Sequence, residues 1–117
     1  MKYIDGFVAA VPQENKQKFI EHVKEASLLI KSYGASRVVE CWGDDVPEGK
    51  ITSMPMAVKC EQNEVVVFSW IEWPDKVTRD KGMKAMMEDE RMANIDMPFD
   101  AKRCIFGGFA PVLDESF

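Results

Sequence analysis

Three carboxylates are the residues of this sequence best placed to do chemistry. Asp5, Glu40 and Glu72 each stand in a segment rich in β-branched and aromatic residues, which is typical of a strand. A carboxylate enclosed among such side chains must be paired, hydrogen-bonded or protonated. In a small-molecule site, an enclosed carboxylate serves as a general base or as an acceptor that orients the ligand. Asp5, Glu40 and Glu72 are therefore the candidate catalytic residues.

Large aromatic side chains accompany these carboxylates in the same segments. Trp42 and Trp70 are candidates for contact with an apolar or aromatic ligand, and Phe68 and Arg103 complete the expected ligand-binding set. We expect a pocket near Trp42 and Trp70 that also contains Glu40 and Glu72.

An ion-pair network is the alternative interpretation of the same carboxylates. Arg37, Arg79 and Arg103 are available as counter-charges. Acids paired in this way would set the register of an interface and would take no part in a reaction. The sequence leaves both interpretations open.

The remaining motifs argue against cofactor and metal chemistry. His22 is the only histidine, and Asp44, Asp45 and Glu48 follow no known spacing of a cation-binding loop. The glycines form no loop that could cradle a phosphate, and no Ser/His/acid arrangement is evident. We expect no cofactor and no metal, and the sequence does not decide whether the protein is an enzyme.

Composition narrows the possible partners and the compartment. The 117 residues fit a single domain, and 15 Lys and Arg against 20 Asp and Glu give a net charge of −5. This charge argues against a nucleic-acid partner and against a polybasic membrane anchor. Three cysteines without a C-x-x-C pair are typical of a reduced cytosol, and no stretch approaches the ~20 apolar residues of a membrane span. We expect a soluble cytoplasmic protein.

The positions of the elements follow from periodicity and from breakers of secondary structure. Strands are expected at residues 3–11, 36–44, 64–73 and 102–112, with a further short strand at 54–60. Helices are expected at residues 13–33 and 75–89, with Asp75 as the N-cap of the second, and a helical turn at 90–94. Gly82 inside the second helix costs roughly 1 kcal/mol relative to Ala, so this helix should depend on packing.

The order of these elements predicts an α+β fold of the ferredoxin-like, split βαβ type. Two helices would then cover one face of an antiparallel sheet. We assign Ile4, Gly6, Val8 and Ala10 to the helix-covered face. The opposite face would carry Trp42, Phe68 and Trp70 together with Glu40 and Glu72.

Aromatic side chains on an uncovered face predict an interaction surface. The simplest solution is a homodimer in which two sheets face each other. The alternative is a monomer in which loops, particularly residues 45–54, fold over that face.

Several stretches resemble a family of small bacterial proteins of unknown function, the YbaA-like family. They are residues 3–8 with Val11-Pro12, residues 38–42, Asp45-Val46-Pro47, Gly49-Lys50, residues 57–59, residues 66–72, residues 97–100, Lys102-Arg103 and residues 107–109. The resemblance implies the dimeric α/β-barrel version of the ferredoxin-like fold. It implies no catalytic residues, because the family has no established activity.

Two functions are consistent with these observations. One is a homodimeric small-molecule-binding protein or cofactor-independent enzyme. The other is a non-enzymatic dimeric accessory module whose buried acids only fix the interface.

Overall fold

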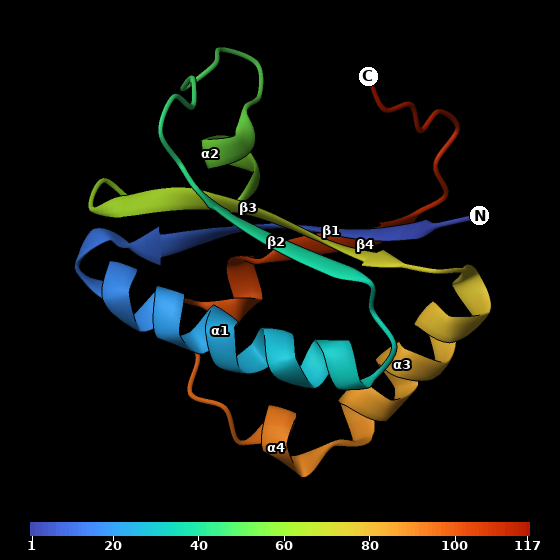
Figure 1. Ribbon diagram of the computed structural model, residues 1–117. Helices are drawn as coiled ribbons and strands as arrows, with labels where there is room; N and C mark the ends of the chain where they lie inside the picture. Colours follow the sequence, from blue (N-terminus) through green and yellow to red (C-terminus); the bar gives the residue numbers. More distant parts are fainter.

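Four antiparallel strands form the sheet in the order β2-β3-β1-β4, in a computed structural model that describes residues 1–117 (Figure 1). The strands are β1 (Tyr3–Pro12), β2 (Arg37–Trp42), β3 (Glu64–Trp73) and β4 (Ile105–Phe109). The central pair, β1 and β3, are in register over ten residues, from Tyr3 opposite Trp73 to Pro12 opposite Glu64. The predicted α+β class is confirmed, with this sheet as its centre.

All helices except α2 (Met54–Ala57) lie close to their predicted positions. They are α1 (Lys16–Ser32), preceded by the 3₁₀ turn η1 (Gln13–Asn15), then α2 (Met54–Ala57), α3 (Lys76–Glu88) and α4 (Glu90–Ala93). The predicted N-cap is confirmed, because Asp75 Oδ1 accepts a hydrogen bond of 2.7 Å from the backbone N–H of Thr78. None of the helices has the length and apolarity that crossing a membrane requires.

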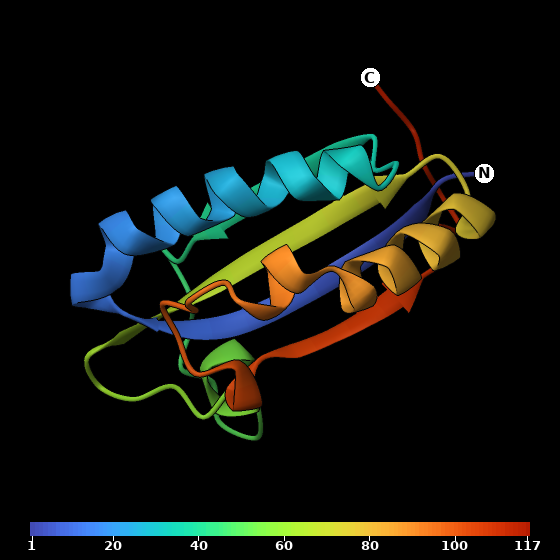
Figure 2. The ribbon, with the colours of Figure 1, turned by 90° about the horizontal axis from the view of Figure 1, so that it is seen from below.

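One face of the sheet is covered by α1, α3 and α4, as both views show (Figures 1 and 2). Phe19 of α1 packs on Ala9 and Val67, while Ile30 packs with Ile71 and Trp73. We call this the helix face and the opposite side the open face.

The segment predicted as a short strand at 54–60 is instead the helix α2, and that prediction is wrong. The Ser53 side chain accepts a hydrogen bond from the Met56 N–H, and Pro55 occupies the first turn, where its missing N–H costs nothing. Val58, just after α2, packs on Ala10 and Val66. The segment therefore covers one end of the open face, which is part of what the monomer alternative expected.

The last strand is shorter than predicted. A 3₁₀ turn, η2 (Ala101–Arg103), precedes it and is capped by the Asp100 carboxylate, and the strand stops at Phe109. Pro111 follows two residues later and cannot donate to the sheet, which fits this early end.

The predicted faces of β1 and β2 are reversed in the structure. Directly opposed residues of antiparallel strands share a face, and Asp5 lies opposite Ile71, which packs on the helices. Tyr3, Asp5, Phe7, Ala9 and Val11 therefore face the helices, and the Ile4, Gly6, Val8 and Ala10 set lies on the open face.

Candidate functional site

Asp5 lies in the buried layer between the sheet and α3. Its residue is 2% exposed, and its carboxylate accepts hydrogen bonds from Arg79 Nη2 at 2.7 Å, Arg79 Nε at 3.0 Å and the Trp73 Nε1 at 2.8 Å. The Arg79 guanidinium also stacks over the Tyr3 ring, 5.1 Å from its centroid. These partners bind both oxygens of the buried carboxylate, as the ion-pair interpretation of Asp5 expects.

Glu40 lies on the helix face of the edge strand β2, opposite Ser69 of β3. The residue as a whole is exposed to solvent, yet protein atoms crowd its carboxyl group. This desolvation raises the pKa of Glu40 to about 7, although Ser69 partly opposes the shift. The Glu40 carboxyl group could therefore exchange its proton near neutral pH.

Trp42, two residues after Glu40 in β2, points to the same face of the sheet. Its ring lies 5.8 Å from the Phe19 ring and 5.4 Å from the Lys16 ammonium. Through these contacts the Trp42 ring packs against α1.

Phe68, Trp70 and Glu72 lie on the open face. Trp70 Nε1 donates to Glu72 Oε2 at 3.0 Å, and Lys2 and Arg37 also pair with this carboxylate, at 3.4 and 3.6 Å. The Trp70 hydrogen bond is the main reason that the pKa of Glu72 falls below its ordinary value.

The predicted placement of Glu40, Trp42, Trp70 and Glu72 on one face is therefore wrong. The pairs Trp42–Val67 and Val39–Trp70 in the β2–β3 register place Glu40 and Trp42 on the helix face, and Trp70 and Glu72 on the open face. A single pocket within one chain does not unite them.

Arg103 also lies apart from these residues, in η2. Its guanidinium donates to both carboxylate oxygens of Glu64, at 2.6 and 2.7 Å, and to the Lys59 carbonyl at 2.9 Å. It forms a further ion pair with Asp100 at 3.2 Å. The ion-pair interpretation fits Arg103 best, because these partners occupy its donors.

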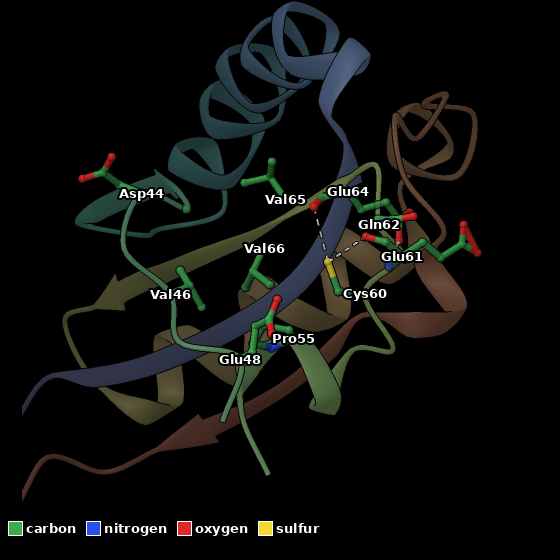
Figure 3. Close-up of a pocket in the computed structure, with 11 residues that line it drawn as sticks. Asp44, Val46, Glu48, Pro55, Cys60, Glu61, Gln62, Glu64, Val65 and Val66 are labelled. Carbon is green, nitrogen blue, oxygen red and sulfur yellow. Dashed lines mark hydrogen bonds between the residues drawn. The ribbon is translucent and has the colours of Figure 1, made fainter. Parts of the chain in front are cut away.

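A cavity of about 520 Å³ lies between the loop after β2, α2 and the first residues of β3 (Figure 3). Its apolar lining comes from Val46, Pro55, Val65 and Val66, and Cys60 also borders it. Figure 3 shows the Cys60 thiol between two backbone carbonyls, to which it donates, those of Glu64 at 3.5 Å and Glu61 at 3.6 Å. Burial raises the pKa of this thiol, so Cys60 is a poor nucleophile at neutral pH.

The polar lining of this cavity is strongly acidic. Asp44, Glu48, Glu61 and Glu64 line it, with Gln62 as the one amide and no Lys or Arg. Only Glu64 is neutralised, by Arg103. Figure 3 shows the Asp44 and Glu61 carboxylates directed outward, so the acidic charge lies at the rim of the cavity, where it would attract a group that carries positive charge.

A smaller cavity of about 280 Å³ adjoins the first and shares Gly43, Asp44, Val46 and Val66 with it. Its remaining lining includes Trp42, Phe68 and Met54. Two of the four expected ligand-binding residues, Trp42 and Phe68, thus border this smaller cavity, while Trp70 and Arg103 line neither of the two cavities described.

Sequence reasoning missed the acids of the larger cavity as a group. Glu48 and Glu61 stand in polar segments that read as turns. One signal in the sequence could have indicated the cavity. Ser53 shortly before Pro55 is typical of the start of a helix, and a helix at this position can fold back over the sheet. No group of three or more His, Cys, Asp or Glu side chains in the structure could hold a metal ion.

Comparison with known proteins gives matches over nearly the whole chain. Residues 2–101 match the family described as protein of unknown function (DUF1428). The uncharacterized protein YbaA of Escherichia coli strain K12 is 54% identical over 117 residues, which cover 98% of this chain and 100% of the relative. YbaA of Shigella flexneri matches with the same identity and coverage.

A solved structure also resembles this one. It is the crystal structure of a dimeric ferredoxin-like protein from an uncultured marine organism, with a TM-score of 0.61 and 10% sequence identity. The alignment covers 97% of this chain and 98% of that chain. At this identity the likeness shows the ferredoxin-like fold alone.

Proposed function

The chain belongs to the DUF1428 family, as its resemblance to YbaA-like proteins predicted, and from this premise we propose that it is a homodimeric protein that binds a small, positively charged molecule. The observation that carries the proposal is the cavity between the loop after β2, α2 and β3. Its volume of about 520 Å³ falls in the range of roughly 300–1,000 Å³ that is usual for ligand pockets.

The charge of the lining defines the class of ligand. Asp44, Glu48 and Glu61 have no ion-pair partner within the chain, and a cation would supply one. The walls formed by Val46 and Val66 favour an apolar body on the same molecule. An amine with an aromatic or branched aliphatic part meets both conditions.

Binding fits this cavity better than catalysis. The Cys60 thiol has a raised pKa, and Arg103 occupies both oxygens of Glu64. The lining thus offers carboxylates that attract charge and no group prepared for nucleophilic attack.

The open face supports the homodimer. Phe68 and Trp70 contact each other there with tilted rings whose centroids are 5.9 Å apart, and Phe68 is 41% exposed in the single chain. Apolar side chains grouped in this way usually mark an interface. The structurally similar protein from the marine organism is itself described as dimeric.

Three matched small molecules test the ligand class. Tryptamine, tryptophol and indole-3-acetate share an indole ring and carry a positive, neutral or negative side chain. Calorimetry should show binding of tryptamine alone, weakened by salt and by Glu48→Gln or Glu61→Gln, because each variant removes one carboxylate from the lining. Glu21→Gln on the exposed side of α1 is the matched control and should bind as the natural sequence does.

The outcomes separate the possibilities. Equal binding of all three molecules would contradict the role of the acidic lining. Absence of binding by any amine in a wider set, including aliphatic polyamines and quaternary ammonium compounds, would contradict the proposal itself.

A cofactor-independent enzyme is the second candidate, favoured by one observation. The pKa of Glu40, about 7, suits a general base, and Ser69 stands beside it. Turnover that follows a single ionisation near pH 7 and is abolished by Glu40→Gln would support this candidate.

A dimeric accessory module without a ligand remains the alternative for the other acids. Asp5 and Glu64 are both completely paired with arginines, as this alternative expects. A dimer that binds none of the amines would favour it.

A further inference from the structure

The open face is bordered on two sides and bare between them. Figure 1 shows α2 above one end of the sheet and residues 110–117 above the other, both on the side opposite to α1, α3 and α4. Between them lie strands that carry Phe68, Ile105 and Phe109 on this face, each 41–60% exposed. The open face therefore carries exposed apolar side chains between two flanking segments.

Residues 110–117, which we call the arm, are unusually apolar for a segment in solvent. Val112 and Phe117 are fully exposed, and Leu113 is 73% exposed. The arm belongs to no helix or strand, and no side-chain hydrogen bond or ion pair connects it to the rest of the chain. Pro111 prevents β4 from extending into it. Its three apolar side chains therefore have no partner within the chain.

The size of the sheet indicates what the arm contributes. The strands have ten, six, ten and five residues, and at about 3.3 Å per residue and about 4.8 Å between strands they span roughly 500 Å². Part of that area is already covered by α2. A stable interface buries about 800 Å² of accessible surface on each partner, and the exposed apolar side chains of the arm would enlarge the contact that this partly covered sheet offers.

We propose that the arms are exchanged in the homodimer: Val112, Leu113 and Phe117 of each chain pack on the open face of the other. This inference rests on the dimer of the proposed function and names the segment that completes its interface. The polar ends of the open face fit this arrangement. The Glu72 cluster with Lys2 and Arg37 lies at one end and the Glu64–Arg103 pair at the other, so the apolar centre would be enclosed by a charged rim.

Sedimentation velocity on the full chain and on an arm variant tests the exchange. The triple substitution Val112→Ser, Leu113→Ser and Phe117→Ser should weaken the dimer about tenfold or more. The control Asp114→Asn with Glu115→Gln changes only polar side chains of the arm and should leave the dissociation constant within about twofold. Circular dichroism should show the same secondary structure in all three, because the arm belongs to none of the elements.

A cross-link identifies which chain the arm contacts. Leu113→p-benzoylphenylalanine in an unlabelled chain, mixed with ¹⁵N-labelled chain of natural sequence, should give a light–heavy cross-linked pair at residues of the open face. Cross-links found only within the light chain would overturn the exchange and show that the arm folds onto its own sheet.

The results distinguish this inference from the proposed function. If the full chain is a dimer and the triple variant dissociates no more readily, the exchange is wrong and the dimer stands. If the full chain is a monomer even at about 100 μM, both the dimer and the exchange are wrong, while the calorimetry of the acidic cavity is still decisive for ligand binding.

Discussion

Arg79 on α3 binds Asp5 on β1 at two points, with Nη2 2.7 Å from Oδ1 and Nε 3.0 Å from Oδ2. The two partners are unequal in their access to water. The Asp5 side chain is 3% exposed, whereas that of Arg79 is 21% exposed and forms a second ion pair with Asp80 at 3.1 Å. Asp5 therefore depends on Arg79 more than Arg79 depends on Asp5.

The first prediction follows from this asymmetry. Arg79→Met leaves a buried carboxylate with only the Trp73 N–H as donor and should lower the free energy of unfolding by about 3 kcal/mol. Asp5→Asn should cost less, because the amide oxygen still accepts from Trp73 and the long Arg79 side chain can reach solvent. Urea denaturation of both variants measures the difference, and a larger loss for Asp5→Asn would contradict this account.

The second prediction concerns Gly82, the buried glycine of α3. A Cβ added there would lie 2.6 Å from Trp73 Cζ3 and 2.9 Å from the Tyr33 carbonyl oxygen. Trp73 is completely buried and has no room to move. Gly82→Ala should therefore destabilise the protein by about 1–3 kcal/mol through overpacking, although Ala is the better helix former by about 1 kcal/mol.

Lys81→Ala serves as the control for Gly82→Ala, because Lys81 is the exposed neighbour on the same helix. Thermal unfolding should show little change for this control. A gain in stability for Gly82→Ala would mean that the close approach of α3 to Trp73 does not require glycine.

Local signals explain why the elements were predictable. The strand at Glu64–Trp73, the helical spacing from Lys16 to Ser32 and the cap at Asp75 each depend on residues near in sequence. The cost of Gly82 was also evident, and the structure gives its reason in the contact with Trp73. These features needed no knowledge of the rest of the chain.

The faces of the strands were not predictable in the same way. The charge of Asp5 predicts a place on the less buried face of the sheet. Its burial is possible because it pairs with Arg79, which lies 74 positions later in the sequence. Trp42 reads as an interface residue, but its ring packs on Phe19 of α1. Both assignments depend on tertiary contacts, which override the alternation of polar and apolar residues.

The candidate site shows the same limit. The larger cavity joins Glu48, Pro55 and Val66, which come from a loop, a short helix and a strand. No spacing in the sequence relates these segments, so the carboxylates could be identified only one by one. Of the residues chosen from the sequence, Trp42 and Phe68 border the smaller cavity beside it.

The third prediction is a pH dependence caused by Glu40. Its pKa in the folded protein is about 7, above its ordinary value of 4.5, because protein atoms desolvate the carboxyl group. Between these values the folded state binds more protons than the unfolded state, so stability falls as pH rises through this window. Since the residue is partly exposed, the effect should be modest.

Glu40→Gln removes this ionisation. The melting temperature of the variant should exceed that of the natural sequence by roughly 2 °C or more at pH 8 and should equal it near pH 4. Glu21→Gln changes the net charge by the same amount at an exposed site and serves as the control. A difference for Glu40→Gln that is the same at both pH values would show that desolvation of Glu40 is not its cause.

The fourth prediction decides between two roles of Arg103, contact with a ligand and neutralisation of Glu64. The guanidinium bound to both oxygens of Glu64 holds the pKa of this carboxyl below its ordinary value of 4.5. The resulting stability is present above that value and is lost as pH falls through the folded-state pKa. Arg103→Gln should therefore lower the melting temperature at pH 7, and its difference from the natural sequence should shrink as the pH falls below about 4.5.

Ligand binding gives the second readout for Arg103. If Arg103 only neutralises Glu64, then Arg103→Gln adds an unpaired carboxylate to the lining of the larger cavity, and tryptamine should bind more tightly than to the natural sequence. Lys102→Gln removes a neighbouring charge that forms no ion pair and is the matched control. Weaker binding of tryptamine to Arg103→Gln, with unchanged binding to Lys102→Gln, would instead show that Arg103 itself contacts the bound molecule or holds the cavity in shape.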